Sequence, residues 1–159
     1  MVKRGVVMLR SILMSMVILS GCVWGEALHV GAVKGMLEHA EKTVTQIDVK
    51  TLKKMIDTNE KFILVDLRGQ SQLERGEIYH TTSYKIERGY LEFQVEKKIP
   101  DKNTKVVVYC CSGLRSILAA ESLMKMGYTN VSSLKGGVIE WVNKDMPLDT
   151  SFGELIVKH

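Results

Sequence analysis

Cys110 is the residue best placed to carry out chemistry in this sequence. It opens a segment between an apolar run and a helical pattern, Cys110-Cys111-Ser112-Gly113-Leu114-Arg115-Ser116. A loop that joins a strand to a helix can turn several backbone N–H groups toward one point, and the helix N-terminus adds partial positive charge. Gly113 allows the backbone to curl, and Arg115 brings a permanent cation with a forked set of donors. The segment therefore predicts an anion-binding cradle with Cys110 as its nucleophile, although free cysteines are often simply core residues.

The elements that must position this loop alternate between strands and helices. Short apolar runs predict strands at residues 62–65, 106–109 and 131–134. Apolar periodicity and capping signals predict helices at residues 48–58, 88–98, 115–126 and 137–141. This alternation implies an α/β fold with a mainly parallel sheet. Because sites in such folds lie at the carboxyl ends of strands, the residues after Val65 and Tyr109 are the candidates.

The loop is one of four ordered motifs by which the chain resembles the rhodanese family of single-domain sulfurtransferases, over residues 43–147. The others are Asp66-Leu67-Arg68, then Gly127-Tyr128 with Asn130-Val131, then Gly136-Gly137 followed by Trp141. The resemblance implies a rhodanese-like fold whose central sheet carries helices on both faces. The sequence departs from the family pattern after Arg68, at Gln72, Leu73, Gly76-Glu77-Ile78 and His80-Thr81. Glu77 stands there in place of a histidine.

The resemblance also implies a ping-pong sulfur transfer at Cys110. The Cys110 thiolate would take the outer sulfur of a small anionic donor such as thiosulfate, and a thiol or cyanide would accept it. The persulfide would be held by backbone N–H groups of residues 111–115, with Arg115 as the second catalytic residue. The substrate-binding loop would comprise Cys111, Ser112, Gly113, Leu114 and Ser116. Asp66 and Arg68 would support the site or form a structural ion pair, and no metal or organic cofactor is implied.

Other functions stay open on the sequence alone. Phosphatases and arsenate reductases also place a cysteine and an arginine around an anion-binding loop, but the phosphatase loop is longer than the four-residue spacing between Cys110 and Arg115. A persulfide carrier, a sensor or a binding module would keep the same loop without turnover. Cys111 is either a small side chain at a tolerant position or a thiol that resolves the Cys110 persulfide or closes an off state.

The first residues of the chain predict export. Residues 1–21 carry three basic residues and no acid, and the apolar run at 11–20 is too short to cross a bilayer. The run ends in Leu19-Ser20-Gly21-Cys22, which resembles the bacterial lipobox, so we expect residues 1–21 to be a signal peptide and Cys22 to be lipidated. The alternatives are a plain secretory signal and an uncleaved membrane anchor.

Removal of this leader changes the charge of the working protein. The chain has 22 basic and 18 acidic residues, and the leader holds three of the basic ones, which leaves a charge of +1. A nucleic-acid partner therefore loses its support. We expect a lipid-anchored tether over residues 22–42, a rhodanese domain over 43–150 and a C-terminal tail over 151–159. The protein would be a monomer on the periplasmic or cell-surface side of a bacterial membrane.

Overall fold

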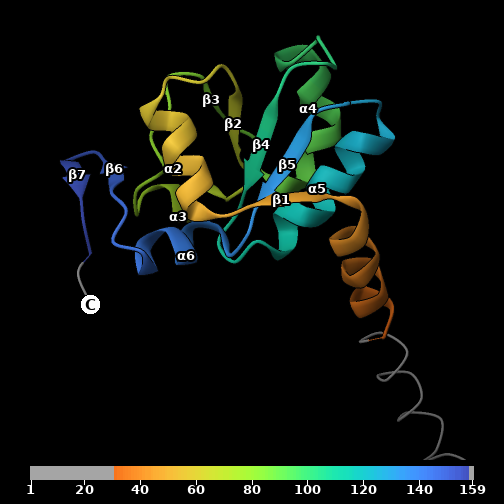
Figure 1. Ribbon diagram of the computed structural model, residues 1–159, viewed down its shortest axis with the longest axis horizontal. Helices are drawn as coiled ribbons and strands as arrows, with labels where there is room; N and C mark the ends of the chain where they lie inside the picture. The colour runs from red at the N-terminus through yellow and green to blue at the C-terminus, as the bar shows by residue number, and fades with distance from the viewer. Residues whose placement is uncertain (1–30, 158–159) are drawn as a thin grey trace, which may run out of the picture. The chain divides into compact units, whose positions relative to one another are not determined.

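The computed structural model describes residues 31–157 (Figure 1). The expected signal peptide and the lipidation site Cys22 therefore lie outside the described residues. The chain divides into two units, residues 1–38 and 39–159. Residues 31–43 are helical, and all but the last of them were expected to belong to the tether over residues 22–42. Within residues 31–157, no helix combines the length and the apolar character that crossing a membrane requires.

A five-stranded parallel sheet forms the centre of residues 39–159 (Figure 1). Its strand order is β1-β5-β4-β2-β3, and the strands are β1 (Thr45–Ile47), β2 (Ile63–Asp66), β3 (Ser83–Lys85), β4 (Val106–Tyr109) and β5 (Val131–Leu134). All four residues of β4 are buried, as expected for a central strand rich in valine that is covered on both sides. The prediction of an α/β fold with a mainly parallel sheet is confirmed.

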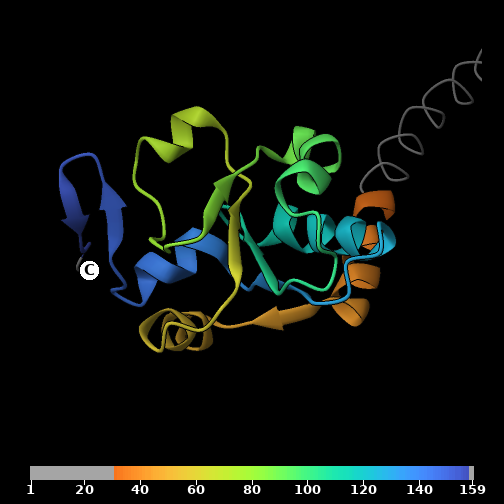
Figure 2. The same ribbon diagram turned by 90° about the horizontal axis from the view of Figure 1, so that it is seen from above.

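Helices cover both faces of this sheet, as the resemblance implied. They are α2 (Val49–Asp57), the short α3 (Gln70–Leu73), a 3-10 turn at Arg88–Tyr90, α4 (Leu91–Lys98), α5 (Leu114–Lys125) and α6 (Gly137–Asn143). Figure 2 shows α2 and α6 on one face and α4 and α5 on the other. Between α2, α6 and the sheet lies an apolar cluster built around Leu52, Leu64, Tyr109 and Trp141.

Local signals explain where several elements begin. The Asp48 side chain accepts a hydrogen bond from the Thr51 N–H at 2.8 Å, so α2 begins at its predicted cap. The predicted helix at 88–98 divides into the 3-10 turn and α4. β1 and β3 were not predicted, because each has three residues and is largely exposed. They gain their strand structure by pairing with β5 and β2.

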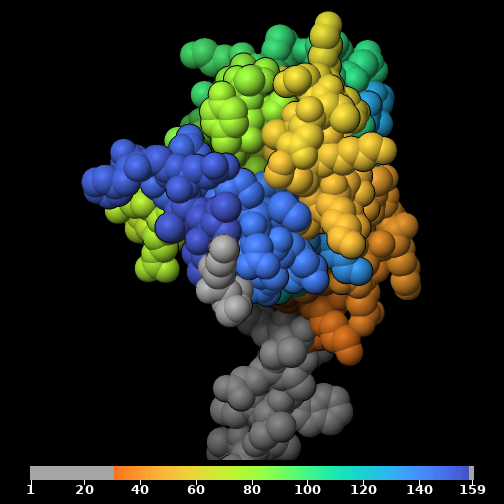
Figure 3. Space-filling model, turned by 60° about the vertical axis from the view of Figure 1, so that its left-hand side comes forward, coloured from red at the N-terminus to blue at the C-terminus, as the bar shows by residue number. Residues whose placement is uncertain are grey.

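A two-stranded antiparallel hairpin follows α6. It consists of β6 (Leu148–Thr150) and β7 (Gly153–Leu155), so the residues expected to form a tail contain a strand. Glu77 and Asp149 form an isolated antiparallel bridge in which each N–H donates to the other's carbonyl at 2.8 Å. The hairpin is thereby fastened to the loop that precedes β3. Figure 3 shows it projecting beyond the surface formed by α2 and α6.

The strand order places a topological switch between β2 and β4. From β2 the chain continues to β3 on one side, and from β4 it continues through α5 to β5 on the other. The loops that follow β2 and β4 therefore leave the sheet in opposite directions. Such a switch point at the carboxyl ends of strands is the usual location of a site in an open α/β sheet. Cys110 directly follows β4 at this position.

Candidate functional site

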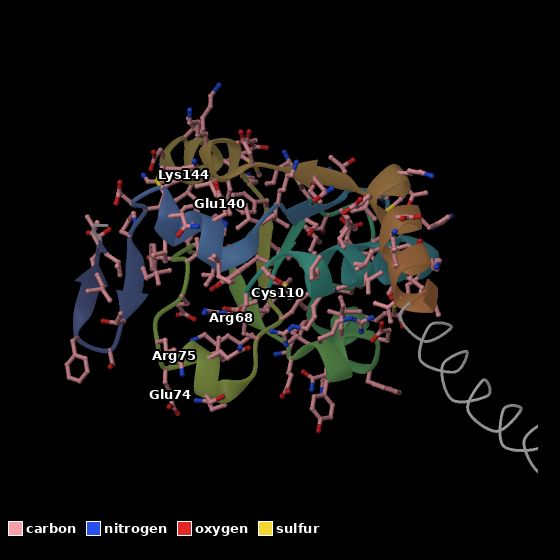
Figure 4. The ribbon with its side chains drawn as sticks, turned by 90° about the horizontal axis from the view of Figure 1, so that it is seen from below. Arg68, Glu74, Arg75, Cys110, Glu140 and Lys144 are labelled. Atoms are coloured by element: carbon pink, nitrogen blue, oxygen red, sulfur yellow. The ribbon has the colours of Figure 1, made fainter. Side chains whose placement is uncertain are left out.

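The loop at the end of β4 holds Cys110 in the interior. Cys110 is fully buried, and the carbonyl of the preceding Tyr109 accepts a hydrogen bond from the Leu67 N–H at 3.0 Å. Gly113 adopts a φ of 89° and caps α5, which begins at the next residue. Only a glycine takes this left-handed conformation without strain. The loop thus turns from strand to helix in four residues, and Figure 4 shows Cys110 in the midst of the surrounding loops and helices.

The N-terminus of α6 fixes the orientation of this loop. The N–H groups of Val138 and Ile139 donate to the carbonyls of Cys110 and Cys111, both at 2.9 Å. No peptide bond in the described residues is cis. In a trans peptide the N–H points opposite to the carbonyl, so the N–H groups of Cys111 and Ser112 point away from α6. The two peptides therefore present their donors on one common side.

These donors continue into the first turn of α5. In the described part of the chain, none of the backbone N–H groups from residue 111 to residue 116 donates to another protein group. The first N–H groups of a helix lack partners within the helix, and a loop of such groups forms a concave anion site. The cradle expected from the sequence is thus a run of unpaired donors beside Cys110.

Two glycines allow the loop and α6 to approach each other. A Cβ on Gly137 would lie 2.4 Å from the Cys110 carbonyl oxygen and 2.6 Å from that of Cys111. A Cβ on Gly113 would lie 2.9 Å from the backbone nitrogen of Gly136. All three distances are shorter than any normal contact to backbone, so Gly113 and Gly137 are both required for the close approach.

A buried hydroxyl pair supports the loop from behind. The Ser133 hydroxyl donates to the Ser116 hydroxyl at 2.9 Å, and Ser116 donates to the Gly113 carbonyl at 3.0 Å. Ser116 and Ser133 are both fully buried, and a buried hydroxyl without a partner is costly. Ser116 was expected in the substrate-binding loop and here supports that loop from the first turn of α5, whereas Ser133 was missed because a single serine in a strand carries no signal.

Arg115 stands at the exposed edge of the loop. Its Nη2 donates to the Gln72 side chain at 3.1 Å and to the Cys111 sulfur at 3.7 Å. Gln72 lies on α3, in the segment that follows β2. It was noted only as a departure from the family pattern, and its contact with Arg115 was missed. Cys111 is half-buried, and neither it nor Cys110 forms a disulfide.

Asp66 and Arg68 form a buried ion pair at the neighbouring strand end. Their side chains are 4% and 3% exposed, and Arg68 Nη2 lies 2.6 Å from Asp66 Oδ2. Arg68 also donates to the carbonyls of Gln72 and Gly76, at 3.3 Å and 2.8 Å. Burial alone would lower the pKa of Arg68, but the hydrogen bonds and charge of Asp66 raise it. The pair holds the loop over residues 66–76 in place.

The strand residue before the nucleophile joins this network. The Tyr109 hydroxyl accepts a hydrogen bond from the Ile78 N–H at 3.3 Å, and the Arg68 guanidinium lies 5.5 Å from the Tyr109 ring centre. Burial, and after it the charge of Asp66, raises the pKa of Tyr109, so its phenol stays protonated at neutral pH. The segment that follows β2 is thereby tied to the strand that carries Cys110.

A groove of about 860 Å³ runs along the outer side of the loop. Ser112, Gly113 and Leu114 line it on the loop side, and Lys135 and Glu140 line it on the side of β5 and α6. Cys110 does not line this groove. Among the described residues, no group of three or more histidine, cysteine or acidic side chains is placed to hold a metal ion.

Comparison with known proteins identifies the family. The sequence profile of the rhodanese-like domain matches residues 48–144, more than half of the chain. The chain belongs to the rhodanese-like domain family. This result confirms the resemblance drawn from the four motifs, and the match includes the whole segment from Asp66-Leu67-Arg68 to Trp141.

Several curated relatives carry sulfurtransferase names. A sulfurtransferase of Allochromatium vinosum is 32% identical over 105 residues, which cover 66% of this chain and 94% of the relative. A putative mitochondrial thiosulfate sulfurtransferase of Schizosaccharomyces pombe is 31% identical over 109 residues, which cover 60% of this chain and 74% of the relative. These relatives support an enzyme of the sulfurtransferase superfamily.

One solved structure with a similar fold carries a different functional suggestion. It is a protein of unknown function from Rhodopseudomonas palustris, described as a possible tyrosine phosphatase. It has a TM-score of 0.66 and 28% identity, and the match covers 73% of this chain and 92% of that one. Phosphatase chemistry is therefore a second candidate for the Cys110 loop.

Proposed function

We propose that this rhodanese-like domain transfers sulfane sulfur from thiosulfate through a persulfide on Cys110 to a thiol acceptor. The observation that carries the proposal is the run of unpaired N–H groups over residues 111–116, which directly follows the buried Cys110. Such donors stabilise a negatively charged sulfur without any side-chain acid or metal. The sulfurtransferase names of the relatives support the same reaction class.

In the first half-reaction, the Cys110 thiolate attacks the outer sulfur of thiosulfate. A new S–S bond forms at Cys110, and the bond between the two sulfur atoms of the donor breaks, so sulfite leaves with its electron pair. Arg115 lies at the exposed edge of the loop, where a guanidinium attracts the dianionic donor and binds an oxyanion through its forked donors. The outer sulfur remains on Cys110 and is held by the N–H groups of the cradle.

In the second half-reaction, an acceptor attacks the outer sulfur of the persulfide. The S–S bond at Cys110 breaks and Cys110 leaves as a thiolate, which the same N–H groups stabilise. The buried Ser133–Ser116 pair and the contacts with α6 keep the loop rigid through both steps. A preorganised cradle of this kind needs no rearrangement when charge moves between the sulfur atoms.

The thiosulfate–cyanide assay tests this proposal. We expect thiocyanate formation by the wild-type protein and its loss in Cys110→Ser, which retains the size of the side chain but not the nucleophile. A protein that acquires sulfur without turning over would be a carrier or sensor instead. Failure of the wild-type protein both to form thiocyanate and to acquire sulfur would reject sulfur transfer.

Phosphatase activity is the second candidate, because a structural relative carries that suggestion. A phosphatase loop must surround a tetrahedral oxyanion, whereas only four residues separate Cys110 from Arg115 here. We expect no Cys110-dependent hydrolysis of p-nitrophenyl phosphate or reduction of arsenate under conditions that give thiocyanate. Hydrolysis that disappears in Cys110→Ser would favour the phosphatase.

We also propose that the domain acts outside the cytoplasm, on a lipid anchor at Cys22. The support is the basic and apolar leader followed by Leu19-Ser20-Gly21-Cys22. After expression of the full chain in a bacterium, we expect the protein in the membrane fraction with a lipid mass on Cys22. The Cys22→Ala variant should lack that lipid mass and should no longer be found among the lipidated proteins. An unmodified wild-type Cys22 would reject the anchor.

A further inference from the structure

The two adjacent cysteines of the loop differ in their access to solvent. Cys110 is fully buried, whereas Cys111 is half-buried beside the exposed Arg115. The large groove on the outer side of the loop does not include Cys110. A small anion such as thiosulfate or cyanide can enter a narrow cradle more readily than a bulky thiol can. The persulfide on Cys110 is therefore formed where a large acceptor has poor access.

The backbone of the two adjacent cysteines is held by α6 on one side of the loop. Both of their carbonyls accept hydrogen bonds from consecutive N–H groups of α6 and therefore point to the same side. In an extended strand, successive residues alternate, and their side chains point to opposite faces. Here the alternation is lost. A persulfide on Cys110 would thus lie next to a second thiol, that of the adjacent residue Cys111.

Arg115 provides a cation at the second sulfur. Its Nη2 donates to Cys111 Sγ at 3.7 Å, and the hydrogen bond to Gln72 at 3.1 Å fixes the guanidinium in that position. A charged donor of this kind stabilises an anionic sulfur. The cation of the loop therefore lies at the half-buried Cys111, where it can stabilise the thiolate form of that residue.

Resting on the proposed function, we propose that Cys111 relays the sulfur from Cys110 to the acceptor. The outer sulfur of the Cys110 persulfide first takes a proton from water, and the Cys111 thiolate then attacks that sulfur. An S–S bond forms at Cys111, the bond to Cys110 breaks, and Cys110 leaves as a thiolate on the cradle N–H groups. The proton stays on the transferred sulfur. The number of S–S bonds is unchanged, so the step needs no oxidant or reductant.

The geometry favours this relay over a disulfide between the two cysteines. In-line transfer needs the two Sγ atoms about 4–5 Å apart, roughly twice an S–S bond length, with the moving sulfur between them. A disulfide would require the two Sγ atoms to approach to about 2 Å. The hydrogen bonds from Val138 and Ile139 oppose the backbone movement that this approach would need. The relay keeps those bonds.

Localisation of the sulfur tests the relay directly. The full-length protein is treated with thiosulfate, quenched at intervals with iodoacetamide and analysed by tandem mass spectrometry, which assigns the extra sulfur to Cys110 or Cys111. We expect the sulfur on Cys110 first and then on both residues, whereas Cys111→Ser should carry it on Cys110 alone. Extra sulfur confined to Cys110 at all times in the wild-type protein would overturn the relay, as would a disulfide between the cysteines.

Acceptor size provides the second measurement. We expect Cys111→Ser to slow transfer to a tripeptide thiol at least tenfold more than transfer to cyanide, because cyanide can reach Cys110 directly. Equal slowing with both acceptors would assign Cys111 a merely structural role and overturn the relay. A wild-type protein with no extra sulfur on either cysteine would contradict the proposed function itself, whereas sulfur confined to Cys110 contradicts only the relay.

Discussion

At the scale of single residues, the site depends on two glycines that lack a side chain where two backbone segments meet. Gly113 and Gly137 have no Cβ where one would collide with backbone atoms of the facing segment. Gly137 matters most, because its missing Cβ leaves room for the carbonyls of both cysteines. Those carbonyls set the direction of the loop N–H groups. A change at Gly137 should therefore reach the chemistry through the backbone, without touching a reacting atom.

Gly137→Ala should disable sulfur transfer more than it unfolds the protein. The new Cβ would lie 2.4 Å from the Cys110 carbonyl oxygen, so the loop must move and its N–H groups lose their common direction. We expect thiocyanate formation to fall by more than tenfold and stability to fall by about 1–3 kcal/mol, measured by denaturant unfolding.

Gly153→Ala is the matched control for this change. Gly153 also has a positive φ, 108°, but a Cβ there would meet nothing within 4 Å. The control carries backbone strain without the collision and should keep its activity. Equal losses of activity in the two variants would show that the contact with the cysteine carbonyls is unimportant.

At the scale of elements, the segment after β2 is held to the end of β4 by a buried charge network. Arg68 reaches Asp66, the Gln72 carbonyl and the Gly76 carbonyl, and it lies over the Tyr109 ring. This segment also carries the Gln72 side chain that holds Arg115. The ion pair therefore acts on the site through the position of a whole segment.

Arg68→Met should destabilise the domain strongly. It leaves the Asp66 carboxylate buried without its partner, and breaking a buried pair in this way costs about 3–5 kcal/mol. Adding Asp66→Asn should recover part of the loss, because the uncompensated charge is removed. Denaturant unfolding of both variants measures this coupling. A single variant within about 1 kcal/mol of the wild type would contradict the structural role of the pair.

The cap of α2 gives this helix a predictable pH dependence. The hydrogen bond from Thr51 lowers the pKa of Asp48 below its ordinary value of 3.8. A lowered native pKa contributes stability that is complete above the unfolded pKa and is lost as pH falls through the native one. Asp48→Asn should match the wild type at neutral pH, since asparagine also caps, and should lose less stability below about pH 4. Parallel melting profiles of the two proteins down to pH 3 would contradict this role.

The sequence was sufficient for the elements with strong local signals and insufficient for those made by pairing. The buried run Val106–Tyr109 and the Asp48 cap identify β4 and α2 by themselves. β1 and β3 are too short and too exposed to show a pattern, and they depend on partners elsewhere in the chain. The β6–β7 hairpin consists of two three-residue strands that pair with each other, and each is too short to show a pattern. The motifs located the loop, but the contacts of Gln72 and Ser133 with it arise only from the folded arrangement.

At the scale of the whole molecule, the location of the candidate site follows from where the strand order reverses. The switch between β2 and β4 brings together the buried ion pair and the cysteine loop, and α6 closes the loop from the other side. The resulting cradle is neutral, made of backbone N–H groups, with Arg115 as the cation at its edge. This arrangement is the basis of the proposed sulfur transfer from a small anion.

The intact mass of the thiosulfate-treated protein tests the central claim most directly. We expect the wild-type protein to gain the mass of one sulfur atom, to lose it on addition of cyanide, and to gain none when Cys110 is changed to serine. The Cys110→Ser variant should have the same melting temperature as the wild type, so that the comparison concerns the thiol alone. A wild-type protein that gains no sulfur, or a Cys110→Ser variant that still gains one, would contradict a persulfide on Cys110.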